Sequence, residues 1–210
     1  MLSCLVGINK LDKGEIEIFG QPIEKVDKAR MGYMPQESAL IPRMTVRETV
    51  WFFGTLFGLD SDKIDERFRF LSNLLELPDQ DRLVKDCSGG QQRRISFALT
   101  LVHEPDILIL DEPTVGVDPL LRHKIWDYFV DLTKNQNVTI LLSTHHIDEA
   151  KESMRVGLMR NGVLVAEDSP QNILQMFETT NLEEAFLKLS EQQELQLASV
   201  NDLTKSGLYD

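Results

Sequence analysis

This sequence of 210 residues has only two cysteines, no long apolar run and no excess of basic side chains. No stretch approaches the roughly 18 consecutive apolar residues that a membrane-spanning helix needs. The first residues also lack the pattern of a secretory signal peptide. We therefore expect a soluble, cytosolic chain, long enough to form one large or two small domains with a buried core.

The scarce residue types exclude several further classes of protein. The two cysteines, Cys4 and Cys87, fit a reducing compartment, and neither has the spacing of a metal ligand. Lys and Arg number 22 against 34 Asp and Glu, which gives a formal net charge of -12. This charge argues against binding to duplex nucleic acid, where basic side chains must neutralise phosphates. It leaves open a small phosphate ligand held by backbone N–H groups.

Alternating buried strands and helices predict the fold class. Four segments have the apolar patterns of strands, and they are "GEIEIFG", "MGYMPQ", "DILILDEP" and "VTILLSTHH". The last two are continuous apolar runs, typical of parallel strands that are buried on both faces. Residues 41–105 are mostly helical in pattern, and one helix there begins with a capping box made by Thr45 and Glu48. We expect an α/β domain with a largely parallel sheet and a helical insert.

The two ends of the sequence have different characters. "MLSCLVGINK" has the pattern of the last turns of a helix, with its apolar face beginning at Leu2. Near the other end, Asn161 and Gly162 predict a hairpin turn, and Ser169 and Pro170 predict the start of another helix. Residues 191–210 are polar and without periodicity, so we expect a mobile tail there.

Polar residues follow three of the predicted strands, at Pro35–Gln36, Asp111–Glu112 and His145. Asp111 and Glu112 end "ILILDEP", and acidic residues at a strand end can simply meet water. In an extended backbone, however, the two would point to opposite faces, so one could hold Mg²⁺ through water while the other polarises an attacking water. His145 follows the next strand and could reach the same crevice, although a lone histidine there is more often structural. We interpret His146 as a bystander.

The segment "CSGGQQRRISFALTLVHEPD" is more specific. Ser88 is a plausible N-cap, and a flexible Gly-Gly turn before a helix would explain the glycines alone. It would not explain the polar run around them. A hydroxyl, the N–H groups of Gly89 and Gly90, and a helix dipole together predict a phosphate site.

In their order along the chain, "YMPQE", "SGGQ", "ILILDEP", "GVDP" and "STHH" resemble the motifs of ATP-binding-cassette (ABC) ATPases. The resemblance implies a P-loop NTPase core with a helical subdomain at about 41–105, all within a cassette over 1–190. Details such as "TVGVDP" look most like exporters, in particular insect half-transporters of the G/H type. The implied ligands are ATP and Mg²⁺, and the implied partners are a second cassette and a transmembrane domain on the cytoplasmic face of a membrane.

The same resemblance assigns roles to individual residues. Gln36 would contact Mg²⁺ and the water, Asp111 would hold Mg²⁺, Glu112 would be the general base, and His145 would touch the γ-phosphate. The residues that would cap the ATP of a second subunit are Ser88, Gly89, Gly90 and Gln91. Asp118 would belong to a loop that crosses between subunits.

One family motif does not occur in the 210 residues. ABC domains carry a Walker A P-loop, G-x-x-x-x-G-K-[ST], just ahead of a helix that continues much like the first residues here. We therefore expect an exporter ATPase cassette that is truncated at its N-terminus. The alternative is a non-catalytic partner that presents its "SGGQ" motif to a complete subunit. A RecA-like motor of another class is a weaker alternative, because "SGGQ" argues against it.

Overall fold

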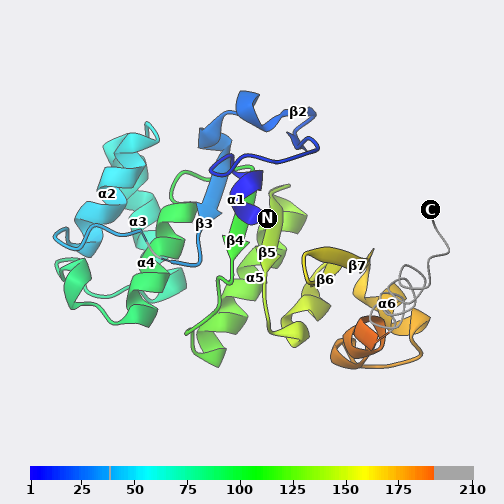
Figure 1. Cartoon of the computed structure of the whole chain (residues 1–210). Coiled ribbons are helices and arrows are strands. Elements are labelled where there is room, and N and C mark those ends of the chain that lie inside the picture. Colours follow the sequence, from blue (N-terminus) through cyan, green and yellow to red (C-terminus); the bar gives the residue numbers. More distant parts are fainter. Residues whose placement is uncertain (38, 192–210) are drawn as a thin grey trace. The chain divides into compact units, whose positions relative to one another are not determined.

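The computed structural model describes residues 1–37 and 39–191 and contains two compact units (Figure 1). The first unit is Met1–Ser143, and the second begins at Thr144. The predicted mobile tail lies outside the described residues from 192 onward. The predicted extent of a cassette over 1–190 stays a prediction.

A three-stranded parallel sheet forms the centre of the first unit. Its strands are β3 (Met31–Met34), β4 (Ile107–Asp111) and β5 (Thr139–Ser143), in the order β3-β4-β5. Asp111 pairs with Ser143, so these two strands end together at one edge of the sheet. The parallel sheet with its helices confirms the predicted α/β class.

The central strand β4 is covered on both faces. Leu108 and Leu110 pack into the larger apolar cluster, which the helices complete. Ile107 and Ile109 pack on the other face into a smaller cluster that includes Leu2. Because neither face meets water, every position from Ile107 to Leu110 is apolar, as the sequence predicts for a central parallel strand.

The edge strand β5 is less buried than predicted. Ile140 and Leu142 pack against the larger cluster, but Thr139 and Leu141 are exposed. The prediction of a fully buried strand is therefore wrong on one face. Among the described residues β5 pairs only with β4, and the smaller cluster includes no residue of β5, so its second face is not covered as the corresponding face of β4 is.

Three helices gather beside β3 (Figure 1) and contribute nearly half of the buried residues of the larger cluster. They are α2 (Val46–Leu56), α3 (Ser61–Leu75) and α4 (Gly89–Leu101), and α5 (Pro119–Asn135) follows β4. The predicted capping box of Thr45 and Glu48 is present at the start of α2. All three helices fall within 41–105, whose status as a separate subdomain stays a prediction.

Gly32 lets β3 lie close to α4. A Cβ atom at this position would come within 2.6 Å of the carbonyl oxygen of Thr100 and 2.7 Å of Leu108 Cδ2. Such distances are too short for any side chain, and one of the two contacts is to rigid backbone. The absence of a side chain at Gly32 therefore sets the spacing between α4 and the sheet.

The beginning of the chain contains short elements. The helix α1 (Leu2–Leu5) is followed by Gly7 with a φ of 75°, which agrees with the predicted helix end. Next come β1 (Glu17–Ile18) and β2 (Gln21–Pro22), an antiparallel pair. The strand predicted from "GEIEIFG" is thus only two residues long, because the chain reverses immediately after Ile18.

The second unit contains the antiparallel hairpin β6 (Val156–Arg160) and β7 (Val163–Asp168), followed by α6 (Pro170–Met176). Asn161 and Gly162 form the predicted turn, with φ angles of 50° and 76°. Ser169 caps α6 as predicted, accepting a hydrogen bond from the N–H of Asn172. Across the described residues of both units, no helix combines the length and apolarity needed to cross a membrane.

Candidate functional site

The ends of β4 and β5 are joined by one hydroxyl group. Ser143 Oγ donates to Asp111 Oδ1 at 2.5 Å and accepts from the N–H of Glu112 at 3.0 Å. The Asp111 carboxylate is therefore oriented by the neighbouring strand. Ser143 was not among the predicted site residues, although its place in "STHH" after a predicted strand was a usable signal.

Glu112 leaves the extended conformation of the strand. Its φ is 50°, in the left-handed region that residues other than glycine seldom adopt. The expectation that Asp111 and Glu112 point to opposite faces assumed an extended backbone through both, and this assumption fails at Glu112. Its N–H bonds Ser143 O at 3.2 Å as well as the hydroxyl, which helps to hold the unusual conformation.

The acidic end of β4 supplies enough protein ligands for Mg²⁺, although it supplies few. No group of three or more His, Cys, Asp or Glu residues that could hold a metal occurs in the described ranges. Mg²⁺ usually keeps several waters and uses only one or two carboxylates. Asp111 supplies one such carboxylate, and Gln36 follows the adjacent strand β3 by two residues with an exposed amide side chain.

The start of α4 is a capping box, as reciprocal bonds between Ser88 and Gln91 show. Ser88 Oγ accepts from the N–H of Gln91 at 3.3 Å, and Gln91 Oε1 accepts from the N–H of Ser88 at 2.9 Å. The helix therefore occupies the acceptor atoms of both side chains. The hydroxyl and amide hydrogens and the first helical N–H groups are all donors, so this surface suits an anion.

The two glycines of this helix start differ in what their surroundings require. A Cβ at Gly90 would come within 3.0 Å of the carbonyl oxygen of Gly116, so packing within the unit favours glycine there. A Cβ at Gly89 would meet nothing within 4 Å, and its φ is not positive. The fold of the described residues does not explain Gly89, whereas a phosphate approaching the backbone does. The site therefore fits a phosphate group.

Asp118 lies at the beginning of α5 and caps it. Its carboxylate accepts from the N–H of Leu121 at 3.0 Å, and this bond holds the pKa of Asp118 below its ordinary value. The side chain is exposed. The structure thus gives Asp118 a local role in starting α5, and its predicted place in a loop between subunits stays a prediction.

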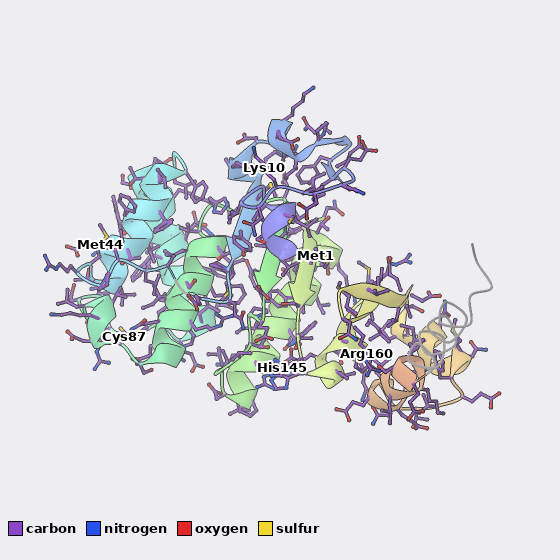
Figure 2. The ribbon with its side chains drawn as sticks, in the orientation of Figure 1. Met1, Lys10, Met44, Cys87, His145 and Arg160 are labelled. Carbon is purple, nitrogen blue, oxygen red and sulfur yellow. The ribbon has the colours of Figure 1, made fainter. Side chains whose placement is uncertain are left out.

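His145 belongs to the second unit and is labelled in Figure 2. It is exposed, and its ring lies 4.1 Å from that of His146, measured between centroids. The approach of His145 to the residues of the first unit stays a prediction, as does the bystander role of His146.

Arg93 was not among the predicted site residues, yet it contacts both strand ends of the site. It lies on α4, and its guanidinium donates to carbonyl oxygens after β3 and at the end of β4. The sequence signal was the pair of arginines in "SGGQQRR", which periodicity alone places only on a helix. No pattern in the sequence indicates which backbone groups an arginine will reach.

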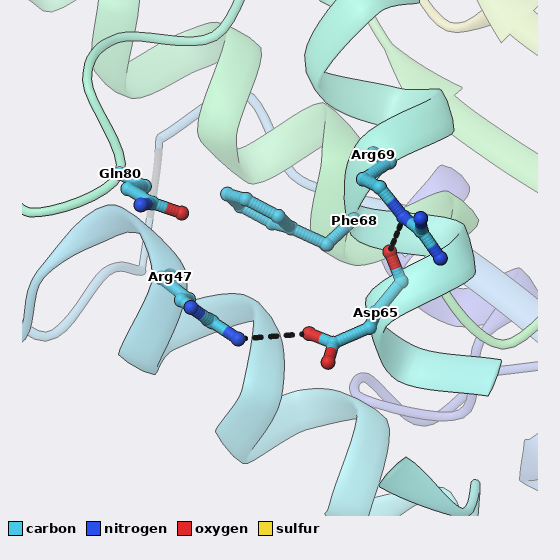
Figure 3. A pocket seen from close by; sticks show the side chains of 5 residues that line it. All are labelled: Arg47, Asp65, Phe68, Arg69 and Gln80. Carbon is cyan, nitrogen blue, oxygen red and sulfur yellow. Dashed lines mark hydrogen bonds and ion pairs between the residues drawn. The ribbon is translucent and has the colours of Figure 1, made fainter. Parts of the chain in front are cut away.

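A separate pocket lies between α2 and α3 (Figure 3). Its volume is about 330 Å³, and its lining residues are Arg47, Asp65, Phe68, Arg69 and Gln80. Arg47 bonds the Asp65 carboxylate at 3.1 Å, and Arg69 Nε bonds the Asp65 carbonyl at 3.2 Å. None of these residues belongs to the predicted site.

Comparison with curated proteins gives relatives over most of the chain. ABC transporter G family member 23 of Dictyostelium discoideum is 38% identical over 193 residues, which cover 90% of this chain and 28% of the relative. Nod factor export ATP-binding protein I of Paraburkholderia xenovorans is 38% identical over 178 residues, 82% of this chain and 58% of the relative. The chain thus spans little more than a quarter of the first relative and less than two thirds of the second.

Solved structures share the fold. The ATP-binding subunit of an ABC transporter matches with a TM-score of 0.81 at 22% identity, covering 90% of this chain and 81% of that one. A dimeric ATP-binding cassette bound to ADP and Pi matches with a TM-score of 0.72 at 23% identity, covering 80% and 78%. A family model described as "ABC transporter" also matches residues 1–115. The chain therefore belongs to the ABC transporter family, as its motifs predict, and has the fold of that family's ATP-binding cassettes.

Proposed function

We propose that this chain is part of the ATP-binding and ATP-hydrolysing cassette of an ABC exporter. The observation that carries the proposal is the start of α4, where Ser88, Gln91 and the first helical N–H groups supply donors and where packing of the described residues does not require Gly89. The acidic end of β4 in the same unit supplies the second half of such a site.

The residues would divide the work between binding and proton transfer. ATP with Mg²⁺, when bound, supplies the phosphoanhydride bond that water cleaves. Asp111 and Gln36 would hold Mg²⁺, and Glu112 would orient the water and accept its proton. His145 would donate a hydrogen bond to the terminal phosphate.

The donors at residues 88–91 would serve the ATP of a second cassette, with Asp118 near the crossing between the two. A transmembrane domain would be the further partner and would place the cassette at the cytoplasmic face of a membrane. The names of two relatives support export and the G family, since one is a Nod factor export protein and the other a G family member.

The 210 residues contain no G-x-x-x-x-G-K-[ST] segment. Charge-assisted hydrogen bonds contribute about 1.5–3 kcal/mol each, and micromolar binding totals only about 8 kcal/mol. Without several such bonds from a P-loop, the 210-residue polypeptide should bind ATP–Mg²⁺ very weakly and show no measurable hydrolysis. Isothermal titration calorimetry tests this, and a dissociation constant in the low micromolar range would contradict it.

A second candidate function follows from the completeness of the α4 start. The capping box and both glycines are in place without a P-loop. The chain could therefore be a non-catalytic partner that presents residues 88–91 to the ATP of a complete subunit. The two functions share this surface and differ in whether Glu112 is needed for hydrolysis.

Two substitutions separate these functions in a cassette extended to include a Walker A segment. Glu112→Gln should keep ATP binding, stop phosphate release and trap an ATP-bound dimer that gel filtration detects. His145→Ala should weaken turnover with less of the trapped dimer. Glu24→Gln, an exposed change distant in sequence, is the control. Normal hydrolysis by Glu112→Gln would refute the role of Glu112 as general base, and an unaltered extended cassette that binds ATP without hydrolysing it would favour the non-catalytic function.

Gly89→Leu tests the surface that the two functions share. The variant should fold, because a Cβ at this position meets nothing within 4 Å. We expect an unchanged melting temperature and loss of the ATP-dependent dimer. Gly90→Leu is the contrasting variant, since it collides with the Gly116 carbonyl and should lower the melting temperature. An ATP-dependent dimer that survives Gly89→Leu would refute the role of this helix start.

A further inference from the structure

Arg93 occupies an unusual position in the first unit. Its Nη1 donates to the carbonyl oxygens of Pro35, at 3.4 Å, and Gln36. Its Nη2 donates to the carbonyl oxygens of Asp111, at 2.5 Å, and Glu112, at 2.6 Å. One guanidinium therefore bonds four backbone carbonyls on two segments that are far apart in the sequence.

These four carbonyls lie just after β3 and at the last residue of β4 or just beyond it, where the sheet no longer supplies partners for every backbone oxygen. The planar fork of arginine has terminal N–H groups for several acceptors at once, whereas a lysine ammonium acts as a compact point charge. The geometry of this cluster thus selects arginine over lysine.

The charge of Arg93 also matters at this place. Burial lowers the pKa of Arg93, and the nearby carboxylates of Glu112 and Asp111 act in the opposite direction. Arginine remains charged at neutral pH. A fixed positive charge therefore lies beside both acidic residues while its hydrogen bonds go to their main chain.

The main chain of Glu112 needs such support. Its φ of 50° is costly for a residue with a side chain, and a strained backbone persists only where its surroundings hold it. Ser143 holds the N–H of Glu112, and Arg93 holds its carbonyl oxygen. Together they fix both peptide groups that determine where the Glu112 side chain points.

We propose that Arg93 is the positioning residue that ties the main chain of Glu112 and Gln36 to α4. The importance of this tie for catalysis depends on the proposed function, but the tie itself does not. Arg93 lies five positions after Ser88 on the same helix. A ligand that moves the start of α4 would therefore act on the general base through one side chain.

Hydrogen–deuterium exchange on the 210-residue chain tests the tie without any nucleotide. The reporters are the amides of Glu112, bonded to Ser143, and Val115, bonded to the Glu112 carbonyl at 3.3 Å. In Arg93→Met we expect both to exchange about tenfold faster, because local opening becomes easier. Arg93→Lys keeps the charge without the fork and should restore protection only in part.

The matched control is Arg67→Met. Arg67 is also a buried guanidinium that bonds a backbone carbonyl, that of Leu101 at 2.9 Å, but on another part of the unit. The Arg67→Met variant therefore distinguishes a general loss of stability from a local increase in amide exchange at Glu112. Equal acceleration of the Glu112 and Val115 amides in both variants would overturn the proposal, as would full protection in Arg93→Met.

A second measurement uses the unaltered chain, in case Arg93→Met does not fold. Four carbonyl acceptors should slow rotation of the Arg93 guanidinium and give separate NMR signals for its Nη hydrogens. Signals averaged like those of the exposed Arg43 would overturn the proposal. If the cassette extended to include a Walker A segment binds no nucleotide but these results hold, the proposed function fails and the role of Arg93 stands.

Discussion

The neighbouring strands β4 and β5 have nearly the same apolar sequence and very different surroundings. Leu108 in β4 is fully buried, whereas Leu141 in β5 is 39% exposed. Both strands nonetheless end together, where Asp111 pairs with Ser143. The comparison shows that apolar content indicates a parallel strand without indicating how many sides of it are covered. It also shows that a half-covered strand can still orient a buried neighbour's carboxylate.

The largest expected effect is a difference in stability between the two strands. Leu108→Ala should lower the free energy of unfolding by about 2–5 kcal/mol, because it leaves a cavity in a closed core. Leu141→Ala should cost less than about 1 kcal/mol, since water already reaches that side chain. Urea denaturation monitored by circular dichroism measures both. Equal losses would show that β5 is as well covered in solution as β4.

The next effect concerns the point where the strands meet. Ser143→Ala removes the donor to Asp111 and one acceptor of the Glu112 N–H, so we expect a loss of about 1–3 kcal/mol. Thr133→Val is the control, because that hydroxyl bonds only carbonyls of its own helix. If both variants melt alike in urea, the shared hydroxyl does not join the strands energetically.

The smallest effect is a pH dependence of the free energy of unfolding. It concerns β3, the strand that pairs with β4 on the side opposite β5. His103 Nε2 bonds the Met31 carbonyl at 3.1 Å, and its ring stacks on Phe57 with centroids 3.8 Å apart. Burial lowers the pKa of His103, against the Met31 bond and together with the charge of Arg67. The unfolded chain then binds the proton more readily, so stability falls as the pH drops below about 6.5.

This contribution should be complete above that pH and disappear in His103→Gln, which keeps a donor without titrating. Thermal melts between neutral and mildly acidic pH provide the measurement. If the two proteins lose stability identically over this range, His103 does not contribute to the pH dependence.

Local signals in the sequence were sufficient for much of the fold. The caps formed by Thr45, Ser88 and Ser169 are present, and so is the turn at Asn161 and Gly162. Each depends on residues within a few positions of one another. The apolar run of β4 was equally informative, because burial on both faces leaves no polar position in such a strand.

The features that the sequence does not predict all depend on contacts between distant segments. The left-handed φ of Glu112 is supported by Ser143 and Arg93, which lie 31 and 19 positions away. The exposure of Leu141 depends on what covers one face of β5. No periodicity encodes such contacts. The sequence therefore predicts the acidic pair but not the backbone conformation that orients its side chains.

Gly32 has a consequence for tolerance to substitution. A scan of all amino acids at this position should accept glycine alone, although the residue is distant in sequence from every predicted site residue except Gln36. Even alanine would press on the Thr100 carbonyl and move α4 outward from the sheet. Arg93 is on that helix and makes two bonds of 2.5 and 2.6 Å to the end of β4, which a shift of less than an ångström would lengthen. The absence of a side chain at Gly32 on β3 thus keeps Arg93 on α4 within hydrogen-bonding distance of the end of β4.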